Sequence, residues 1–236
     1  MKKTILLFLF LYFTLVVFSQ NSAREFYSSA LINDSLKDYP AAMQDLDRAL
    51  QMDTKYDSAY CLQGIINFKL GEYKLSIKQL NTVLKTKPDY FDAVYTRALA
   101  KAQLEYYIDA IKDFNKAITL NPNHAKAYYN RALTKGHLND YTSAISDLDK
   151  AIGLDTKYIN AYYSRAFWKD ISGDYNGALA DYKKVIELDG SYREAYISMA
   201  TAMYQHGEKS QACETLKTAA DKGSVMAEEL TTKLCN

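Results

Sequence analysis

Two kinds of residue return along this chain at a constant interval of 34 residues. The alanine column consists of Ala59, Ala93, Ala127, Ala161 and Ala195, and the tyrosine column consists of Tyr39, Tyr73, Tyr107, Tyr141 and Tyr175. A register that persists over such a length is typical of stacked structural repeats. Within one interval the apolar residues follow the spacing of two short amphipathic helices, joined by a tight turn such as that at Asn139 and Asp140. The periodicity therefore predicts an all-α chain of repeated helical hairpins.

The repeat divides the chain into six hairpins and one further helix. The hairpins are expected at about residues 23–56, 57–90, 91–124, 125–158, 159–192 and 193–224, within an array that spans residues 20–225. The first hairpin is degenerate, because Ser29 departs from the pattern. Its second helix is well marked, since Asp38 is a good N-cap and Pro40 falls in the first turn, where a missing N–H is harmless. Residues 225–236 are expected to cap the array, with a short helix from Val225 to Leu234, because the last hairpin would otherwise expose its apolar face.

The recurring residues resemble the tetratricopeptide repeat family, and the resemblance extends over about residues 22–225. In the third hairpin, the family's order of small, aromatic and proline residues is seen as Ala93, Ala98, Tyr107, Ala117 and Pro122. The resemblance implies a right-handed α-solenoid of six helix-turn-helix repeats of 34 residues with a C-terminal capping helix. It also implies a non-catalytic scaffold that binds a protein or peptide in a concave groove, although the family shares a scaffold rather than one chemistry.

Small residues are predicted to let the two helices of each hairpin approach closely. They are Gly64, Ala98, Ala132, Ala166 and Ala200 in the first helices, and Ala42, Ser76, Ala110, Ala144, Ala178 and Ala212 in the second helices. A larger side chain at Ala132 or Ala144 would overpack the contact, at a cost of roughly 1–3 kcal/mol. These columns are structural and need no ligand to explain them.

An arginine and an aspartate occur together in the third, fourth and fifth hairpins. The pairs are Arg97 with Asp113, Arg131 with Asp147, and Arg165 with Asp181. The second hairpin has Gln63 with Gln79 and the sixth has Met199 with Thr215, whereas the first breaks the rule with Ser29 and Asp45. We therefore predict an ion pair that bridges the two helices of each of these three hairpins.

The N-terminus has the pattern of a secretory signal peptide. Two lysines precede an apolar run from Ile5 to Phe18, and polarity returns at Ser19. We expect residues 1–19 to be removed by cleavage after Ser19. An uncleaved anchor is the alternative, but the run is shorter than the roughly 20 residues that span a bilayer. No cysteine follows the leader as a lipid acceptor, so we expect a periplasmic or secreted protein, and the leader together with the Tyr-, Lys- and Asn-rich composition is typical of a bacterial one.

The charge of the chain argues against two classes of partner. The formal net charge of +1 falls to −1 when the two leader lysines are removed. Binding to nucleic acid or to a membrane surface requires a basic excess. The expected partner is therefore a protein or peptide, with no nucleic acid and, after cleavage of the leader, no membrane.

The first helix of each hairpin is expected to line the concave surface, and helical spacing selects the side chains that point into it. The candidate groove residues are Tyr95, Leu99, Lys126, Tyr129, Leu133, His137, Tyr163 and Phe167. Tyrosine combines a large contact area with a hydroxyl at low entropic cost, which suits peptide recognition. The alternative is that the tyrosines only pack between adjacent first helices. Some family members grip a chaperone's C-terminal carboxylate with lysine and asparagine, but Tyr129 and Leu133 occupy those positions here.

Two of the three cysteines are candidates for a disulfide. Cys213 lies in the second helix of the sixth hairpin and Cys235 ends the terminal helix, so a bond would staple the cap to the array in an oxidising compartment. Two separate buried thiols are the alternative. Cys61 is then the odd thiol, without a nearby histidine or asparagine in the sequence that would make it a nucleophile.

Nothing in the motifs favours catalysis. The sequence has no Gly-rich phosphate loop, no Ser nucleophile elbow and no pair of catalytic carboxylates. His124, His137 and His206 are scattered and form no metal-ligand motif. We expect no enzyme activity, no metal and no cofactor. A structural subunit of an envelope or secretion assembly, which binds through its convex face or its ends, is the second hypothesis, and an enzyme with an undetected site ranks last.

Overall fold

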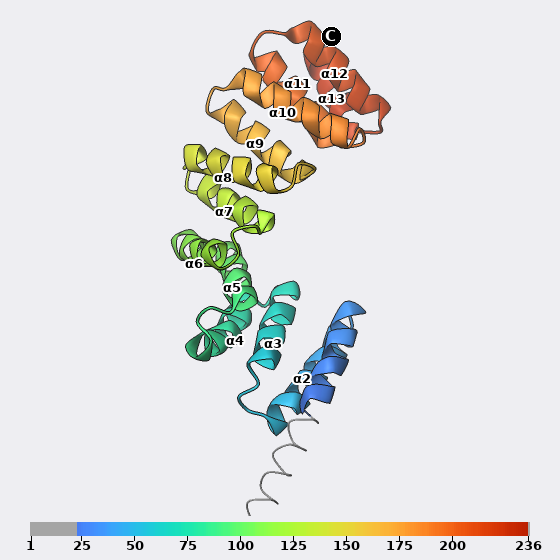
Figure 1. Cartoon of the computed structure of the whole chain (residues 1–236). Helices are drawn as coiled ribbons and strands as arrows, with labels where there is room; N and C mark the ends of the chain where they lie inside the picture. Colours follow the sequence, from blue (N-terminus) through green and yellow to red (C-terminus); the bar gives the residue numbers. More distant parts are fainter. Residues whose placement is uncertain (1–22, 236) are drawn as a thin grey trace, which may run out of the picture. The chain divides into compact units, whose positions relative to one another are not determined.

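The structure is a computed structural model that describes residues 23–235, and all regular secondary structure in this range is helical. The chain divides into two compact units, one that ends at Leu120 and one that begins at Asn121. Within each unit successive helices form antiparallel pairs that stack in sequence order (Figure 1). This is the arrangement of an α-solenoid, so the predicted fold class, all-α helical hairpins with a final capping helix, is confirmed.

The N-terminal unit contains three hairpins. Its helices are residues 23–35, α2 (Tyr39–Met52), α3 (Asp57–Lys69), α4 (Tyr73–Thr86), α5 (Phe91–Gln103) and α6 (Tyr107–Leu120). The second helices α2, α4 and α6 pack on the first helices of their own hairpins, and α2 and α4 also pack on the first helix of the next hairpin. The first helices α3 and α5 also touch each other directly. The predicted leader, residues 1–19, lies outside the described residues.

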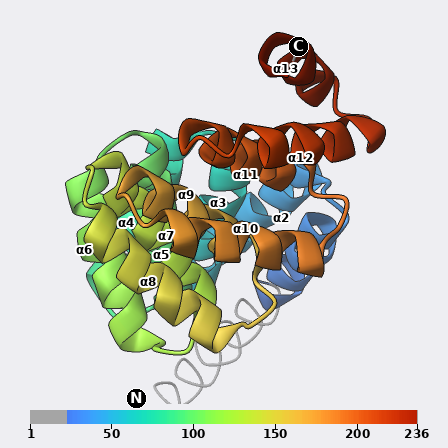
Figure 2. The same ribbon diagram turned by 90° about the horizontal axis from the view of Figure 1, so that it is seen from above.

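The C-terminal unit contains three further hairpins and the cap. Its helices are α7 (Ala125–His137), α8 (Tyr141–Leu154), α9 (Ile159–Ile171), α10 (Tyr175–Leu188), α11 (Arg193–Gln205), α12 (Lys209–Asp221) and α13 (Val225–Leu234). The first helices are again in direct contact, α7 with α9 and α9 with α11. The last helix α13 lies against α12 (Figure 2). The bounds predicted for this helix are confirmed.

The turn within each hairpin needs one residue in the left-handed region of φ. The residues with this conformation are Lys37, Gly71, Glu105, Asn139, Gly173 and Gly207, and they recur at the interval of the repeat. Glycine adopts positive φ without strain, whereas a side chain such as that of Glu105, at φ 63°, pays a steric cost. An aspartate begins the next helix in three hairpins: Asp38, Asp140 and Asp174 each accept a hydrogen bond from a backbone N–H of the first turn. The predicted caps at Asp38 and Pro40 are therefore confirmed.

The small-residue columns bring helices into close contact, as predicted. A Cβ atom built on Gly64 would lie 2.6 Å from the side chain of Leu80, closer than packing allows. Ala132 and Ala144 have no exposed surface. A second close approach was not predicted: a Cβ on Gly136 of α7 would collide with the indole ring of Trp168 on α9. The indole also stacks on Tyr141, with ring centres 5.1 Å apart.

Candidate functional site

The predicted groove residues fall in both units, and we describe them as two surfaces. The α7/α9 surface consists of Lys126, Tyr129, Leu133, His137, Tyr163 and Phe167. The α5 surface consists of Tyr95 and Leu99. Because α7 contacts α9 directly, the two rows of the α7/α9 surface belong to neighbouring helices of one compact unit.

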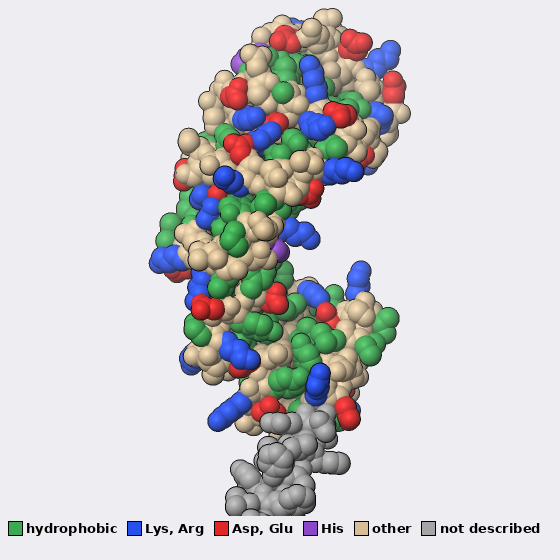
Figure 3. Space-filling view, in the orientation of Figure 1, with side chains coloured by type: hydrophobic (Ala, Val, Ile, Leu, Met, Phe, Trp, Pro, Cys, Tyr) green, Lys and Arg blue, Asp and Glu red, His purple; other side chains and the backbone are tan. Residues whose placement is uncertain are grey.

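The α7/α9 surface joins accessible apolar side chains to polar ones. Phe167 is 42% exposed, and Tyr129, Leu133 and Tyr163 are half-buried. Lys126 and His137 are exposed on α7. An accessible aromatic centre beside polar groups is the composition of many protein-binding surfaces. Figure 3 shows how acidic, basic and apolar side chains are interspersed elsewhere on the visible face of each unit.

The tyrosines of this surface are held in place by other aromatic rings. The ring of Tyr129 lies 5.0 Å from that of Tyr158, at the start of the next hairpin. Tyr163 lies 5.3 Å from Tyr192 and its hydroxyl is 3.0 Å from the Ser198 hydroxyl. Burial, with a further contribution from the nearby Tyr163, raises the pKa of Tyr192. The packing role that sequence reasoning left open is thus present, and it leaves each of the two predicted tyrosines partly accessible.

One carboxylate, that of Asp170, lies beside this aromatic cluster. Asp170, near the end of α9, is half-buried, and burial raises its pKa although nearby His206 lowers it. Buried Tyr182, which packs edge-on against Tyr163, has its pKa raised by burial and by the charges of Tyr163 and Asp170. Asp170 therefore adds a polar, titratable group at the end of α9, next to the aromatic cluster.

The α5 surface is smaller and its aromatic residue is more firmly packed. Tyr95 stacks on Phe91 with ring centres 5.7 Å apart and meets the edge of Phe114 at 6.1 Å. Leu99 packs against the same cluster. On neighbouring α3, Cys61 is only 2% exposed, and burial raises the pKa of its thiol to about 12. Cys61 is therefore a core residue in its thiol form rather than an activated nucleophile.

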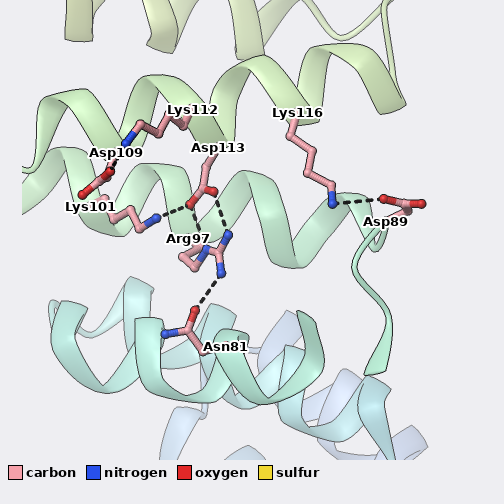
Figure 4. A network of polar contacts seen from close by, with 8 residues as sticks. All are labelled: Asn81, Asp89, Arg97, Lys101, Asp109, Lys112, Asp113 and Lys116. Carbon is pink, nitrogen blue, oxygen red and sulfur yellow. Dashed lines mark hydrogen bonds and ion pairs between the residues drawn. The ribbon is translucent and has the colours of Figure 1, made fainter. Parts of the chain in front are cut away.

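The predicted arginine–aspartate pairs are present in all three hairpins. Nε and Nη2 of Arg97 donate to the two oxygens of Asp113 at 2.8 and 2.7 Å (Figure 4). Arg131 grips Asp147 and Arg165 grips Asp181 in the same bidentate manner. The aspartate side chains are only 7–9% exposed, so these are nearly buried ion pairs. Burial disfavours the charge of Arg165, but its hydrogen bonds to Asp181 and Asp149 raise its pKa above the ordinary value.

Sequence reasoning missed a third member of each network. A lysine one turn after the arginine donates to the same aspartate: Lys101 to Asp113, Lys135 to Asp147 and Lys169 to Asp181, at 2.7–2.9 Å. These lysines recur at the interval of the repeat, which is the signal that would have found them. In the first hairpin Ser29 and Asn33 donate to Asp45 in the equivalent arrangement. The network joins the helices of a hairpin and explains why these columns are polar.

The sulfur atoms of Cys213 and Cys235 are bonded in the structure, with Cα atoms 5.7 Å apart. This bond ties the end of α13 to α12. His124 caps α7 by accepting the Ala127 N–H, and His206 stacks on Tyr175. Within residues 23–235 no group of three or more His, Cys, Asp or Glu side chains is placed to hold a metal ion. Among the same residues, no helix has the length and apolar character needed to cross a membrane.

Comparisons with solved structures find the same architecture. MamA is 26% identical, with a TM-score of 0.66 over 70% of this chain and 96% of MamA. YrrB, described as a tetratricopeptide repeat protein with an unusual peptide-binding site, is 18% identical, with a TM-score of 0.69 over 80% of this chain and 98% of YrrB. PilF of Pseudomonas aeruginosa is 14% identical, with a TM-score of 0.76 over 91% of this chain and 99% of PilF. The last two likenesses show the fold alone.

Family models give the assignment directly. Models described as tetratricopeptide repeat match residues 57–90, 91–124, 114–146 and 171–224, which together cover more than half of the chain. No curated protein matches the chain. The matched residues include many of the recurring small residues and tyrosines and the arginine–aspartate pair of the third hairpin, Arg97 and Asp113. The chain therefore belongs to the tetratricopeptide repeat family, whose members are protein-binding scaffolds.

Proposed function

We propose that this protein is a non-catalytic scaffold that binds a protein or peptide segment on the α7/α9 surface. The observation that carries the proposal is the exposure of Phe167, which is 42% exposed on a surface that also presents Lys126 and His137. Exposed aromatic side chains near the centre of a surface are frequent anchors of protein interfaces. The α5 surface, with Tyr95 and Leu99, provides a smaller apolar contact in the other unit.

The packing of the tyrosines supports this function. Tyr129 and Tyr163 are fixed by Tyr158 and Tyr192, so little side-chain freedom remains to be lost when a partner binds. The Tyr163 hydroxyl already bonds to the Ser198 hydroxyl, which also helps to hold this ring in place. Exposed Lys126 and His137 supply polar contacts at the margin. The peptide-binding site named for YrrB is in keeping with this use of the fold.

We further propose that the protein acts in the cell envelope, in the periplasm or outside the cell. The N-terminal pattern of a signal peptide supports export, with cleavage after Ser19. The bond between Cys213 and Cys235 supports an oxidising compartment. The mass of the N-terminal peptide of the protein purified from its host tests this. A chain that retains residues 1–19, or is recovered from the cytosol with reduced cysteines, would contradict it.

Selection of peptides on the purified protein tests the α7/α9 surface. We expect a phage-displayed random library to enrich apolar and aromatic peptides, and Phe167→Ala to weaken their binding about tenfold, as removal of an interface anchor does. The matched control is Leu154→Ala on α8, which removes an equally exposed apolar side chain, 42%, from a second helix. Fluorescence polarisation measures both affinities. Equal affinities of the two variants for the enriched peptides would contradict the proposal.

A structural subunit that binds through its ends is the second candidate. Large apolar side chains are exposed at both ends of the described chain: Ile32 and Leu36 are 61% and 71% exposed, and Val225 and Met226 on α13 are 67% and 60% exposed. Exposed apolar residues at the end of a repeat array are open to association with another subunit. Sedimentation of the native assembly separates the candidates. Only in this second case does Val225→Ser with Met226→Ser dissociate the protein, while Phe167→Ala leaves it assembled.

A further inference from the structure

The second helix of the second hairpin, α4, differs from the other second helices in its charge. Residues 73–86 carry Lys74, Lys78 and Lys85 and no acidic residue. Every other second helix contains at least one: Asp45 in α2, Asp113 in α6, Asp147 in α8, Asp181 in α10 and Glu214 in α12. The aspartate that recurs in the networks of hairpins three to five is replaced in α4 by Gln79. This helix therefore carries a local excess of positive charge in a chain that is close to neutral.

The three lysines line an open recess of about 640 Å³ in the N-terminal unit. Asn81, Thr82 and Arg97 also line it, and no residue in its lining is acidic. Within residues 23–235 no ion pair is formed by Lys74, Lys78 or Lys85. The recess thus presents three unpaired ammonium groups toward the solvent.

Three acidic residues on the neighbouring elements are already engaged elsewhere. Asp57 is bound by Lys87 at 3.3 Å and by Thr86 at 2.8 Å, and Asp89 is bound by Lys116 at 3.0 Å. Asp113 faces both Arg97 and Lys101, so that network keeps a net positive charge beside the recess. None of these carboxylates therefore remains free to neutralise the α4 lysines.

Asn81 adds a directed donor to the recess. Its side-chain oxygen accepts a hydrogen bond from Nη1 of Arg97 at 2.7 Å, and Arg97 is itself held by Asp113. Figure 4 shows the amide nitrogen of Asn81 on the side away from Arg97. An amide whose oxygen is engaged offers its N–H groups to an acceptor. The recess consequently combines cationic charge with a fixed neutral donor, both of which suit a carboxylate.

The spacing of the three lysines favours an extended ligand over a small anion. Along an α-helix with about 1.5 Å of rise per residue, Lys74 and Lys85 are separated by roughly 16 Å, with Lys78 between them. A single small anion reaches one or two of these groups. An extended peptide, which rises about 3.3 Å per residue, faces all three with about five residues. We propose that the α4 recess is a second binding site, independent of the α7/α9 surface, which takes an extended peptide segment rich in Asp and Glu.

Binding of a fluorescein-labelled oligoglutamate peptide of about six residues, long enough to span the lysines, tests the proposal. We expect the full-length mature protein to bind it with an affinity that falls as salt is added, because exposed charges are screened. The variant Lys74→Gln, Lys78→Gln, Lys85→Gln should bind about tenfold more weakly. The matched control is Lys150→Gln, Lys183→Gln, Lys217→Gln, which removes the same charge from exposed positions of the C-terminal unit. This control should change the affinity less than about twofold.

Several outcomes would overturn the proposal. Absence of peptide binding by the unmodified protein, or equal weakening by both triple variants, would show that α4 is no site or that only net charge matters. Binding of vesicles rich in anionic phospholipid without binding of the peptide would make α4 a membrane-facing surface instead. An oligoglutamine peptide must fail to bind. Phe167→Ala should leave oligoglutamate binding unchanged, so failure of the α4 site and failure of the α7/α9 surface are observed separately.

Discussion

The left-handed turn residues show how a single position limits a helical hairpin. Six residues at the interval of the repeat have positive φ, and three of them, Lys37, Glu105 and Asn139, are not glycine. Asparagine tolerates this conformation better than residues with longer side chains. The side chain of Asn139 also accepts a hydrogen bond from the Tyr141 hydroxyl at 2.6 Å. Lys and Glu are not residue types that favour the left-handed region, so the backbone at Lys37 and Glu105 is strained.

Replacement of Glu105 by glycine should therefore stabilise the protein. We expect Glu105→Gly to raise the free energy of unfolding by about 0.5–1 kcal/mol, because relief of the steric cost exceeds the added entropy of the unfolded chain. Glu105→Ala keeps the Cβ atom and should give no gain. Urea denaturation followed by circular dichroism measures both variants. If Glu105→Gly and Glu105→Ala stabilise the protein equally, the gain comes from loss of the carboxylate and not from relief of backbone strain.

The burial of Cys61 should be visible in its reactivity. Because burial raises the pKa of this thiol to about 12, almost no thiolate exists in the native state at pH 8. We expect Ellman's reagent to find no reactive thiol in the native protein and one after denaturation without reductant. Because the unfolded chain releases the Cys61 proton at lower pH than the folded protein, the free energy of unfolding should fall as the pH rises from about 9 to about 12. Rapid labelling of the native protein at pH 8 would contradict the buried position.

The charged networks predict that Asp147 contributes far more to stability than Asp149, two residues further along α8. Asp147 is 5% exposed and holds both Arg131 and Lys135, whereas the side chain of Asp149 is 54% exposed and holds one nitrogen of Arg165. Asp147→Asn should cost about 3 kcal/mol, because two poorly solvated cations lose their anion. Asp149→Asn should cost less than about 1 kcal/mol. Thermal unfolding compares them, and similar losses would show that the network is not buried in solution.

At the level of the element, the sixth hairpin shows that the charged network can be replaced as a whole. There Met199, Met203 and Thr215 stand at the positions of the arginine, lysine and aspartate, and both methionines are only 7% exposed. The Thr215 hydroxyl is 3.8 Å from the sulfur of Met203. The chain therefore contains a nearly apolar version of the same helix pair.

Transfer of this version into the fourth hairpin should be well tolerated. We expect the triple variant Arg131→Met, Lys135→Met, Asp147→Thr to lose about 1 kcal/mol or less, although Asp147→Asn alone loses more. An unpaired buried charge is costly, whereas complete replacement by packed side chains of similar volume is nearly neutral. Chemical denaturation of both variants provides the comparison. A triple variant less stable than the single one would show that the ion pairs themselves stabilise the hairpin.

Much of this element-level structure was predicted from the sequence. The hairpins and the arginine–aspartate pairs follow from repeated residues, because a repeat shows each contact several times. The cap at Asp38 and Pro40 follows from local capping chemistry, and the helix Val225–Leu234 from the need to cover the last apolar face. The contact of Gly136 with Trp168 was missed, since the chain has a single tryptophan and the pair occurs once. The recess on α4 was missed for the same reason: it depends on one hairpin that departs from the pattern. The groove residues remain a prediction.

At the level of the whole molecule, the main helix contacts among residues 23–235 join neighbouring helices or neighbouring first helices. A change at one end of such a chain is therefore expected to remain local, because each hairpin is stabilised by its own packing and by its immediate neighbours. The disulfide lies at the C-terminal end and joins two cysteines that are 22 positions apart in the sequence. It offers a direct way to test how far stability is shared along the chain.

Reduction of the bond between Cys213 and Cys235 should weaken one end of the molecule. The chain-entropy model gives a loss of roughly 3 kcal/mol for a loop of this length. We expect hydrogen exchange to accelerate in α12 and α13 and to remain unchanged in α3 and α4. The variant Cys213→Ser with Cys235→Ser should reproduce the effect without reductant. Uniform acceleration over all the helices would instead indicate that the chain unfolds as one cooperative body.

The single tryptophan has a practical consequence for all of these measurements. Trp168 lies between the backbone of α7 at Gly136 and the ring of Tyr141, and its ring centre is 4.8 Å from that of Phe167. Excited selectively, it is an intrinsic fluorophore placed at the junction of two hairpins and next to the proposed anchor. Occupation of that face by a ligand should shift its emission or alter its quenching by iodide, whereas filling of the α4 recess should leave the spectrum unchanged. The protein thus carries an unlabelled optical probe that distinguishes its two proposed sites.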